Sequence, residues 1–155
     1  MVIARMISPK DAATALLIVL LTATAARPQT PFARQPLQKD HPAIGAWRIE
    51  LPQLNCFEQM DFRPDGTRSV ISGKEIAQAE FAISRKPDAR GFYSWSDRIV
   101  SVNGQPDCVG SLTKAGTVSH GFMVFNEDKN SFFLCPDADG KSCIGPYVKI
   151  AGTDS

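Results

Sequence analysis

Residues 45–50 read GAWRIE and begin a part of the chain in which apolar and polar residues alternate. Trp47, Ile49 and Leu51 occupy every second position of this stretch. Successive side chains of a β-strand point to opposite faces of its sheet, so this alternation is typical of a strand with one buried face. The stretch therefore predicts that the chain enters a β-sheet at Gly45.

Turn signals follow this stretch at uneven intervals, as Pro-Asp pairs that begin at Pro64, Pro87, Pro106 and Pro136. Unequal spacing excludes a repeat protein with a fixed period. The first pair continues as PDG, which predicts a hairpin because Pro fixes the φ angle of the first turn position and Gly accepts the left-handed conformation.

Short strands are expected between these turns. They cover residues 45–51, 56–63, 67–72, 77–84, 92–102, 109–113, 119–126, 131–135 and 145–150. The segment GKEIAQAE at residues 73–80 could form one helical turn, but no longer amphipathic helix is indicated. Consecutive short strands predict an all-β fold, an antiparallel up-and-down barrel of about eight strands, because closure removes the exposed sheet edges.

The start of the chain has the features of an export signal. Arg5 and Lys10 precede an apolar run over residues 12–25 that ends in small residues, which predicts a signal peptide at residues 1–26. The alternative is an uncleaved membrane anchor, but the run is shorter than the about 20 residues that a spanning helix needs. We therefore expect a periplasmic or secreted protein.

Three further segments follow the predicted signal peptide. Residues 27–44 contain four prolines and little apolar periodicity, which predicts a flexible arm. The barrel domain is expected over residues 45–150, and residues 151–155 are expected to be a disordered tail.

The charges of the exported chain are balanced. Residues 1–26 hold two of the 17 basic and one of the 16 acidic residues, so the remaining chain carries 15 of each. It has neither a basic stripe nor a run of like charge. Nucleic acid is therefore excluded as an expected partner, and so is recruitment to a membrane surface through charge.

The four cysteines predict structural disulfides, because their number is even and the chain is expected to be exported. Of the three possible connectivities we favour Cys56–Cys108 and Cys135–Cys143, the second of which flanks a turn-rich segment. The chain has no C-x-x-C pair and only two histidines, so no metal site is expected.

Motifs for catalysis are absent from the sequence. It contains no G-x-S-x-G, no H-E-x-x-H, no phosphate-binding glycine loop and no dinucleotide fingerprint. His41 and His120 have no sequence partner that would make a nucleophile and base pair. Paired carboxylates stay open, because their spacing is spatial. We expect no catalytic residue, no cofactor and no enzyme activity.

The GAW of Gly45-Ala46-Trp47, the strand meander and the closing strand GPYVKI together resemble the lipocalin or calycin class of small barrels, most closely small exported lipocalin-like domains of bacteria. The resemblance implies that Trp47 plugs the barrel floor. It also implies that a basic side chain from the last strand stacks over this Trp, and Lys149 would supply it where the family more often uses Arg.

Two functions follow from a barrel of this kind. The first is a binding module that holds a small apolar or amphipathic ligand. Its candidate lining residues are the aromatic side chains Trp47, Phe62, Phe81, Phe122 and Phe132. The alternative is an interaction protein, such as an inhibitor of an exported hydrolase, that uses the barrel rim or the N-terminal arm. A hollow barrel favours the first function, whereas a filled barrel with a protruding arm favours the second.

The exported protein is expected to begin at Ala26 or Arg27, because small residues end the apolar run at this point. Intact-mass measurement of protein recovered from the periplasm or the medium tests this prediction. A mass that still includes residues 1–25 would contradict it.

Overall fold

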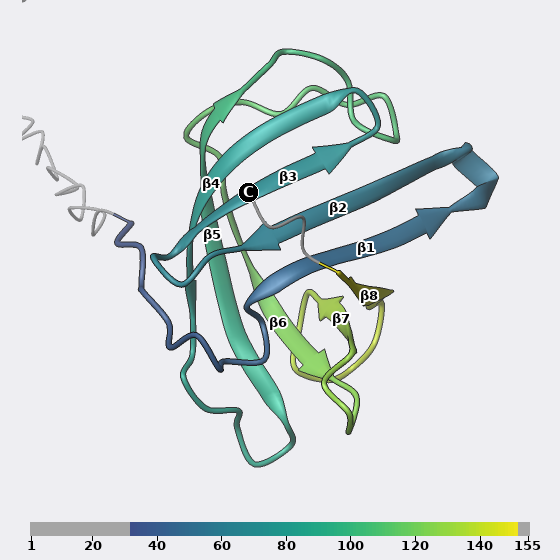
Figure 1. Cartoon of the computed structure of the whole chain (residues 1–155). Helices are drawn as coiled ribbons and strands as arrows, with labels where there is room; N and C mark the ends of the chain where they lie inside the picture. The colour runs from purple at the N-terminus through teal and green to yellow at the C-terminus, as the bar shows by residue number, and fades with distance from the viewer. Residues whose placement is uncertain (1–31, 152–155) are drawn as a thin grey trace, which may run out of the picture. The chain divides into compact units, whose positions relative to one another are not determined.

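The computed structural model describes residues 32–151, and these residues form a closed barrel of eight antiparallel strands (Figure 1). The barrel confirms the predicted fold class. The strands are β1 (Gly45–Leu51), β2 (Cys56–Phe62), β3 (Thr67–Ser72), β4 (Glu75–Ile83), β5 (Phe92–Val102), β6 (Val118–Phe125), β7 (Ser131–Cys135) and β8 (Ile144–Ile150). A 3-10 turn, η1 (Pro52–Leu54), follows β1. The predicted signal peptide, the start of the predicted arm and residues 152–155 of the predicted tail lie outside the described residues.

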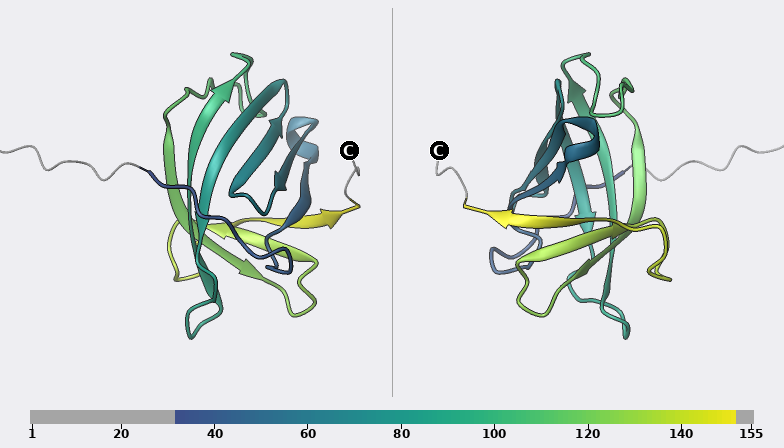
Figure 2. Two further views of the ribbon diagram at one scale, coloured as in Figure 1. Left: turned by 60° about the vertical axis from the view of Figure 1, so that its left-hand side comes forward. Right: turned by 90° about the vertical axis from the view of Figure 1, so that its right-hand side faces the viewer.

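Each strand pairs with its neighbours in the sequence, and β8 pairs with β1 to close the barrel. Figure 2 shows β8, in yellow, running across the direction of the teal strands β4 and β5, as expected for opposite walls of a small barrel with tilted strands. In the closing pair Trp47 lies opposite Lys149, and the Lys149 Nζ lies 5.2 Å from the centroid of the Trp47 ring. The cation–π contact implied by the resemblance is therefore present.

The hairpin predicted from PDG joins β2 to β3. Gly66 has a φ of +85°, and the Asp65 carboxylate accepts a hydrogen bond from the Thr67 amide at 2.9 Å. Asp88 and Asp107 accept backbone amides in the same way after the next two Pro-Asp pairs. The turn chemistry read from the sequence is confirmed at these three places.

The strand expected at residues 109–113 is absent. These residues lie in the loop between β5 and β6, where the Asp107 carboxylate accepts hydrogen bonds from the Val109 and Ser111 amides at 3.0 and 2.7 Å. Local side-chain bonds of this kind compete with a sheet ladder for the same backbone groups. The prediction of a strand is therefore wrong here.

The helical turn considered for residues 73–80 is also absent. Gly73 and Lys74 form the turn between β3 and β4, and β4 begins at Glu75. Pairing with β3 gives the backbone of this segment its hydrogen bonds, so tertiary contacts override its local helix propensity.

The described part of the predicted arm, residues 32–44, is docked against the barrel and runs beside it into β1 (Figure 1). The Gln35 amide donates to the Phe81 carbonyl at 2.8 Å, and the Leu37 amide donates to the Pro64 carbonyl at 2.9 Å. The Leu37 side chain is buried. The prediction of a flexible arm is wrong for these residues, because backbone hydrogen bonds and apolar contacts fix them to the barrel.

The neutral His41 side chain holds this docked segment in place. Its Nδ1 accepts a hydrogen bond from the Ala43 amide at 3.2 Å, so its Nε2 is the atom that donates to the Ser84 carbonyl, also at 3.2 Å. The ring meets Tyr93 edge to face, with 5.2 Å between the centroids. Burial lowers the pKa of His41 from its ordinary value of 6.5, against weaker opposing effects of the Ser84 carbonyl and the Asp40 charge.

The free energy of unfolding is therefore expected to fall as the pH decreases below about 6.5, because the unfolded chain then binds a proton that the buried His41 resists. The contribution is fully present above this pH and is lost toward the lower folded pKa. Urea unfolding of wild type and His41→Gln between pH 7.5 and 5 measures it, and the variant should show a weaker pH dependence. His120→Gln, at the exposed second histidine, is the control, and an equal effect of both substitutions would contradict the prediction.

Candidate functional site

Four of the five candidate lining residues fill one end of the barrel. Trp47, Phe62, Phe81 and Phe132 are at most 1% exposed. The Trp47 and Phe132 rings meet edge to face with centroids 4.9 Å apart, and the Phe62 and Phe81 rings do so at 5.1 Å. These rings form a packed core instead of lining an open space. We call this the sealed end, because residues 32–44 also dock there.

Phe122, the fifth candidate, does not belong to this core. On β6 the fully buried Met123 faces inward, and Phe125 packs on the same side against Trp47. Phe122 is half-buried, contacts the Phe92 ring at a centroid distance of 6.4 Å and lines a groove over β4, β5 and β6. Its predicted inward orientation is wrong, because strand parity places it on the other side of the sheet from Met123.

Both predicted disulfides, Cys56–Cys108 and Cys135–Cys143, are present. Cys56–Cys108 lies at the end of the barrel opposite the sealed end, and we call this the disulfide end. Cys56–Cys108 ties the β5–β6 loop to the start of β2. The loop packs so closely that a Cβ on Gly73 would lie 3.2 Å from the backbone carbon of Asp107. Gly73 also has a φ of +59°, so glycine is required at this turn for two reasons.

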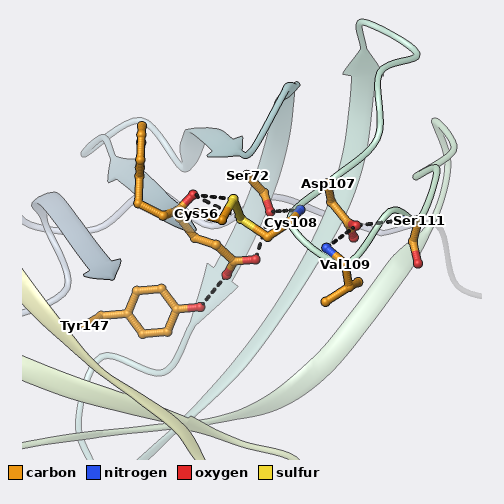
Figure 3. Close-up of a disulfide and its surroundings, with 9 residues drawn as sticks. Cys56, Ser72, Asp107, Cys108, Val109, Ser111 and Tyr147 are labelled. Carbon is orange, nitrogen blue, oxygen red and sulfur yellow. Dashed lines mark hydrogen bonds between the residues drawn. A yellow bond between two sulfur atoms is a disulfide. The ribbon is translucent and has the colours of Figure 1, made fainter. Parts of the chain in front are cut away.

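A row of polar side chains crosses the inner wall at the disulfide end, and Figure 3 shows one of its members, Ser72, beside Cys108. Glu58, Ser72 and Glu75 lie directly opposite one another on β2, β3 and β4, so they share one face of the sheet, and we call them the carboxylate row. The Ser72 hydroxyl donates to Glu58 Oε1 at 2.8 Å and accepts from the Cys108 amide at 3.2 Å. The row is thus connected to the disulfide through one serine.

Tyr147 reaches the carboxylate row from β8. Its hydroxyl donates to Glu58 Oε2 at 2.8 Å, while its ring stacks on Phe132 of the sealed end with centroids 5.1 Å apart. Burial raises the pKa of Tyr147 well above its ordinary value of 10.0, and the adjacent Glu58 charge raises it further. Tyr147 therefore stays protonated and acts as a donor to Glu58.

A buried ion pair lies deeper in the barrel. The Arg68 Nη2 pairs with Asp97 Oδ2, and the side chains of the two residues are 7% and 1% exposed. The Arg68 Nη1 lies 2.9 Å from the Met60 sulfur, and the guanidinium carbon is 5.5 Å from the centroid of the Trp95 ring. Arg68 thus bridges β2, β3 and β5 inside the barrel.

Four buried polar atoms have no hydrogen-bond partner among the described residues. They are Arg68 Nε, Asp97 Oδ1, Trp95 Nε1 and Glu75 Oε2. Buried polar groups are nearly always paired, and unpaired ones are costly. The interior therefore retains two free donors and two free acceptors.

Some inward-facing residues at the disulfide end are half-buried, unlike the aromatic residues of the sealed end, although Ser72, Glu75 and Ala77 are buried. Leu51, Glu58, Val70 and Val102 are only half-buried. Val70, Ala77 and Val102 lie opposite one another, so apolar side chains continue the wall below the carboxylate row. This wall combines carboxylates, hydroxyls and small apolar groups, and it is the candidate functional site.

Sequence reasoning missed the polar members of this site. Arg68 lies in a predicted strand, and Glu75 lies two residues before the next one. Polar residues in such positions usually face solvent. The register of the PDG hairpin could have revealed Arg68, because this turn places Arg68 opposite Phe62. The two side chains therefore lie on the same, inward face of the sheet.

Comparisons with protein-family models, curated proteins and solved structures found no match to this chain. Within residues 32–151, no group of three or more His, Cys, Asp or Glu side chains could hold a metal ion. No helix in the same part of the chain is long and apolar enough to cross a membrane.

Asp97→Ala is expected to lower the free energy of unfolding by about 3–5 kcal/mol, because it leaves the Arg68 charge buried without a partner. The double variant Arg68→Met, Asp97→Leu removes both charges, so its free energy of unfolding should fall less than that of Asp97→Ala. Denaturant unfolding measures both. Glu50→Ala breaks the exposed Arg48–Glu50 pair and is the control, with an expected loss below about 1 kcal/mol. A double variant less stable than Asp97→Ala would contradict this account.

Proposed function

We propose that the protein is an exported, non-enzymatic binding module that holds a small amphipathic molecule against the inner wall at the disulfide end. One observation carries this proposal. Four inward-facing side chains at the disulfide end, Leu51, Glu58, Val70 and Val102, are half-buried, whereas the aromatic side chains of the sealed end, Trp47, Phe62, Phe81 and Phe132, are at most 1% exposed. Binding sites for small molecules combine apolar walls with a few polar groups that fix orientation.

The composition of this wall favours an amphipathic ligand over a purely apolar one. Val70 and Val102 are half-buried and pack with the buried Ala77 in an apolar cluster, and Ala77 leaves β4 without a bulky inward side chain at this level. Glu58 and Glu75 lie at one edge of that surface. A molecule with an apolar body and a polar group would match both parts.

The disulfides support the proposed location. Disulfides persist in oxidising compartments such as the periplasm or the extracellular space. Cys56–Cys108 and Cys135–Cys143 therefore agree with the signal peptide predicted at residues 1–26. The lipocalin resemblance points in the same direction, because it implies a small exported barrel.

A second function, interaction with another exported protein, is favoured by the rim of the disulfide end. Val109 and Leu112 of the β5–β6 loop are 70% and 64% exposed, and Leu54 of the neighbouring turn is 48% exposed. The Cys56–Cys108 bond fixes the loop that carries Val109. We assign this function to the rim because residues 32–44 of the arm are docked against the barrel.

Native mass spectrometry of protein purified from its own host is expected to find a co-purifying small molecule. Returning this molecule to stripped protein should raise the melting temperature, because a ligand that prefers the native state stabilises it by mass action. The fluorescence of Trp95, which lies beside Arg68, should change on binding.

Val70→Phe is expected to abolish this stabilisation, because it places a larger side chain on the inner wall. Ile71→Phe, at the next residue of β3 and on the opposite face, is the matched control and should bind as wild type does. Normal binding by Val70→Phe would contradict the proposed site. A stoichiometric protein partner that is lost when Val109 and Leu112 are replaced by Ser would favour the second function instead.

A further inference from the structure

We infer that the ligand carries an organic ammonium group and that this group binds at the carboxylate row, Glu58, Ser72 and Glu75. The inference rests on the proposed function and adds the chemical class of the ligand. It depends on three features of the row: its charge, the partners of its carboxylates and the wall beside it.

The carboxylate row has two acidic groups and no cation of its own. None of the ion pairs formed by residues 32–151 includes Glu58 or Glu75. Arg68, the buried cation of the interior, is already paired with Asp97. The negative charge of the row is therefore not balanced by a neighbouring side chain of the described chain.

The two carboxylates differ in how they are held. Glu58 receives one hydroxyl donor at each oxygen, from Ser72 and Tyr147. Glu75 is only 5% exposed, and its Oε2 has no hydrogen-bond partner among the described residues. An unpaired buried carboxylate costs several times more than a paired one. Glu75 is thus a buried acceptor that a ligand donor could satisfy.

An ammonium group matches this deficit in charge and in hydrogen bonding. It carries one positive charge and three N–H donors, and bonds between charged partners are roughly twice as strong as neutral ones. An alcohol would supply a donor without the charge, and a carboxylate would add repulsion. The row therefore selects for a cation.

The shape of the neighbouring wall favours an amine with an apolar chain. Val70 and Ala77 lie on β3 and β4, the two strands that carry Ser72 and Glu75, two residues along on the same face. Ala77 is buried and Val70 is half-buried, so an alkyl chain attached to the ammonium group would lie against the Val70 side chain. A bare divalent ion would find two carboxylates and a hydroxyl, fewer than the six to eight oxygens that Ca²⁺ takes.

The test uses the full exported chain and three probes of equal length, hexylamine, 1-hexanol and hexanoate, with melting temperature and calorimetry as readouts. Hexylamine is expected to bind saturably and at least tenfold more tightly than the other two. Glu75→Gln, which keeps the shape of the side chain but removes its charge, should weaken hexylamine binding at least tenfold. Glu58→Gln is the second variant and should also weaken it.

Glu50→Gln is the matched control, because Glu50 is exposed on the outer face of β1, and it should bind hexylamine as wild type does. Circular dichroism of each variant verifies that it is folded. Equal binding of the three probes, or unchanged hexylamine binding by folded Glu75→Gln, would overturn the ammonium inference. So would competition by micromolar CaCl₂.

Failure of the proposed function would give a different experimental result from failure of the ammonium inference. If it is wrong, no small molecule co-purifies and Val70→Phe changes the binding of no probe. If only the ammonium inference is wrong, a neutral or anionic molecule still binds and Val70→Phe still blocks it. The two failures are therefore distinguishable.

Discussion

The contacts of Trp47 connect the start of the barrel to its last two strands. Its indole Nε1 donates to the Ala43 carbonyl at 2.9 Å, its ring meets Phe132 of β7 edge to face, and Lys149 of β8 lies over it. One side chain thus joins the segment before β1 to the two strands that complete the barrel. Closure of the sheet and sealing of one end have the same physical cause.

Sealing one end concentrates the apolar stabilisation there. Burial of an aromatic or large aliphatic side chain contributes about 1.5–3 kcal/mol, and Phe62, Phe81 and Phe132 are all buried at this end. An eight-stranded barrel is near the boundary between a packed and a hollow interior, so side-chain size decides the outcome. Large rings fill one half, whereas Ala77 and Ser72 leave the other half with small inward side chains. Glu58, Ser72 and Glu75 lie in this second half, whereas the Arg68–Asp97 pair lies opposite Phe62 and Phe81.

The sequence predicts the elements of this fold better than its interior. Alternation and turn residues are local signals, so seven of the eight strands and the hairpin were expected nearly in place, and β4 was displaced only at its start. Which face a residue takes depends on register, which pairing between strands decides. Arg68 and Glu75 are therefore inside although their residue types predict solvent. Phe122 is outside the core for the same reason, since Met123 has the inward parity.

The buried charges of the interior differ in what they contribute to the fold. Arg68 and Asp97 neutralise each other, and Glu58 is held by two hydroxyls. Even charged groups that are paired in this way rarely stabilise a protein more than apolar residues of the same volume would. Glu75 lacks any comparable partner at Oε2, so its burial is a cost to folding that no contact of the described chain offsets. Violations of local rules concentrate at functional sites. Glu75 lies at the end of the barrel where Glu58, Val70 and Val102 are half-buried, and this is the physical reason for proposing binding there and not among the aromatic rings.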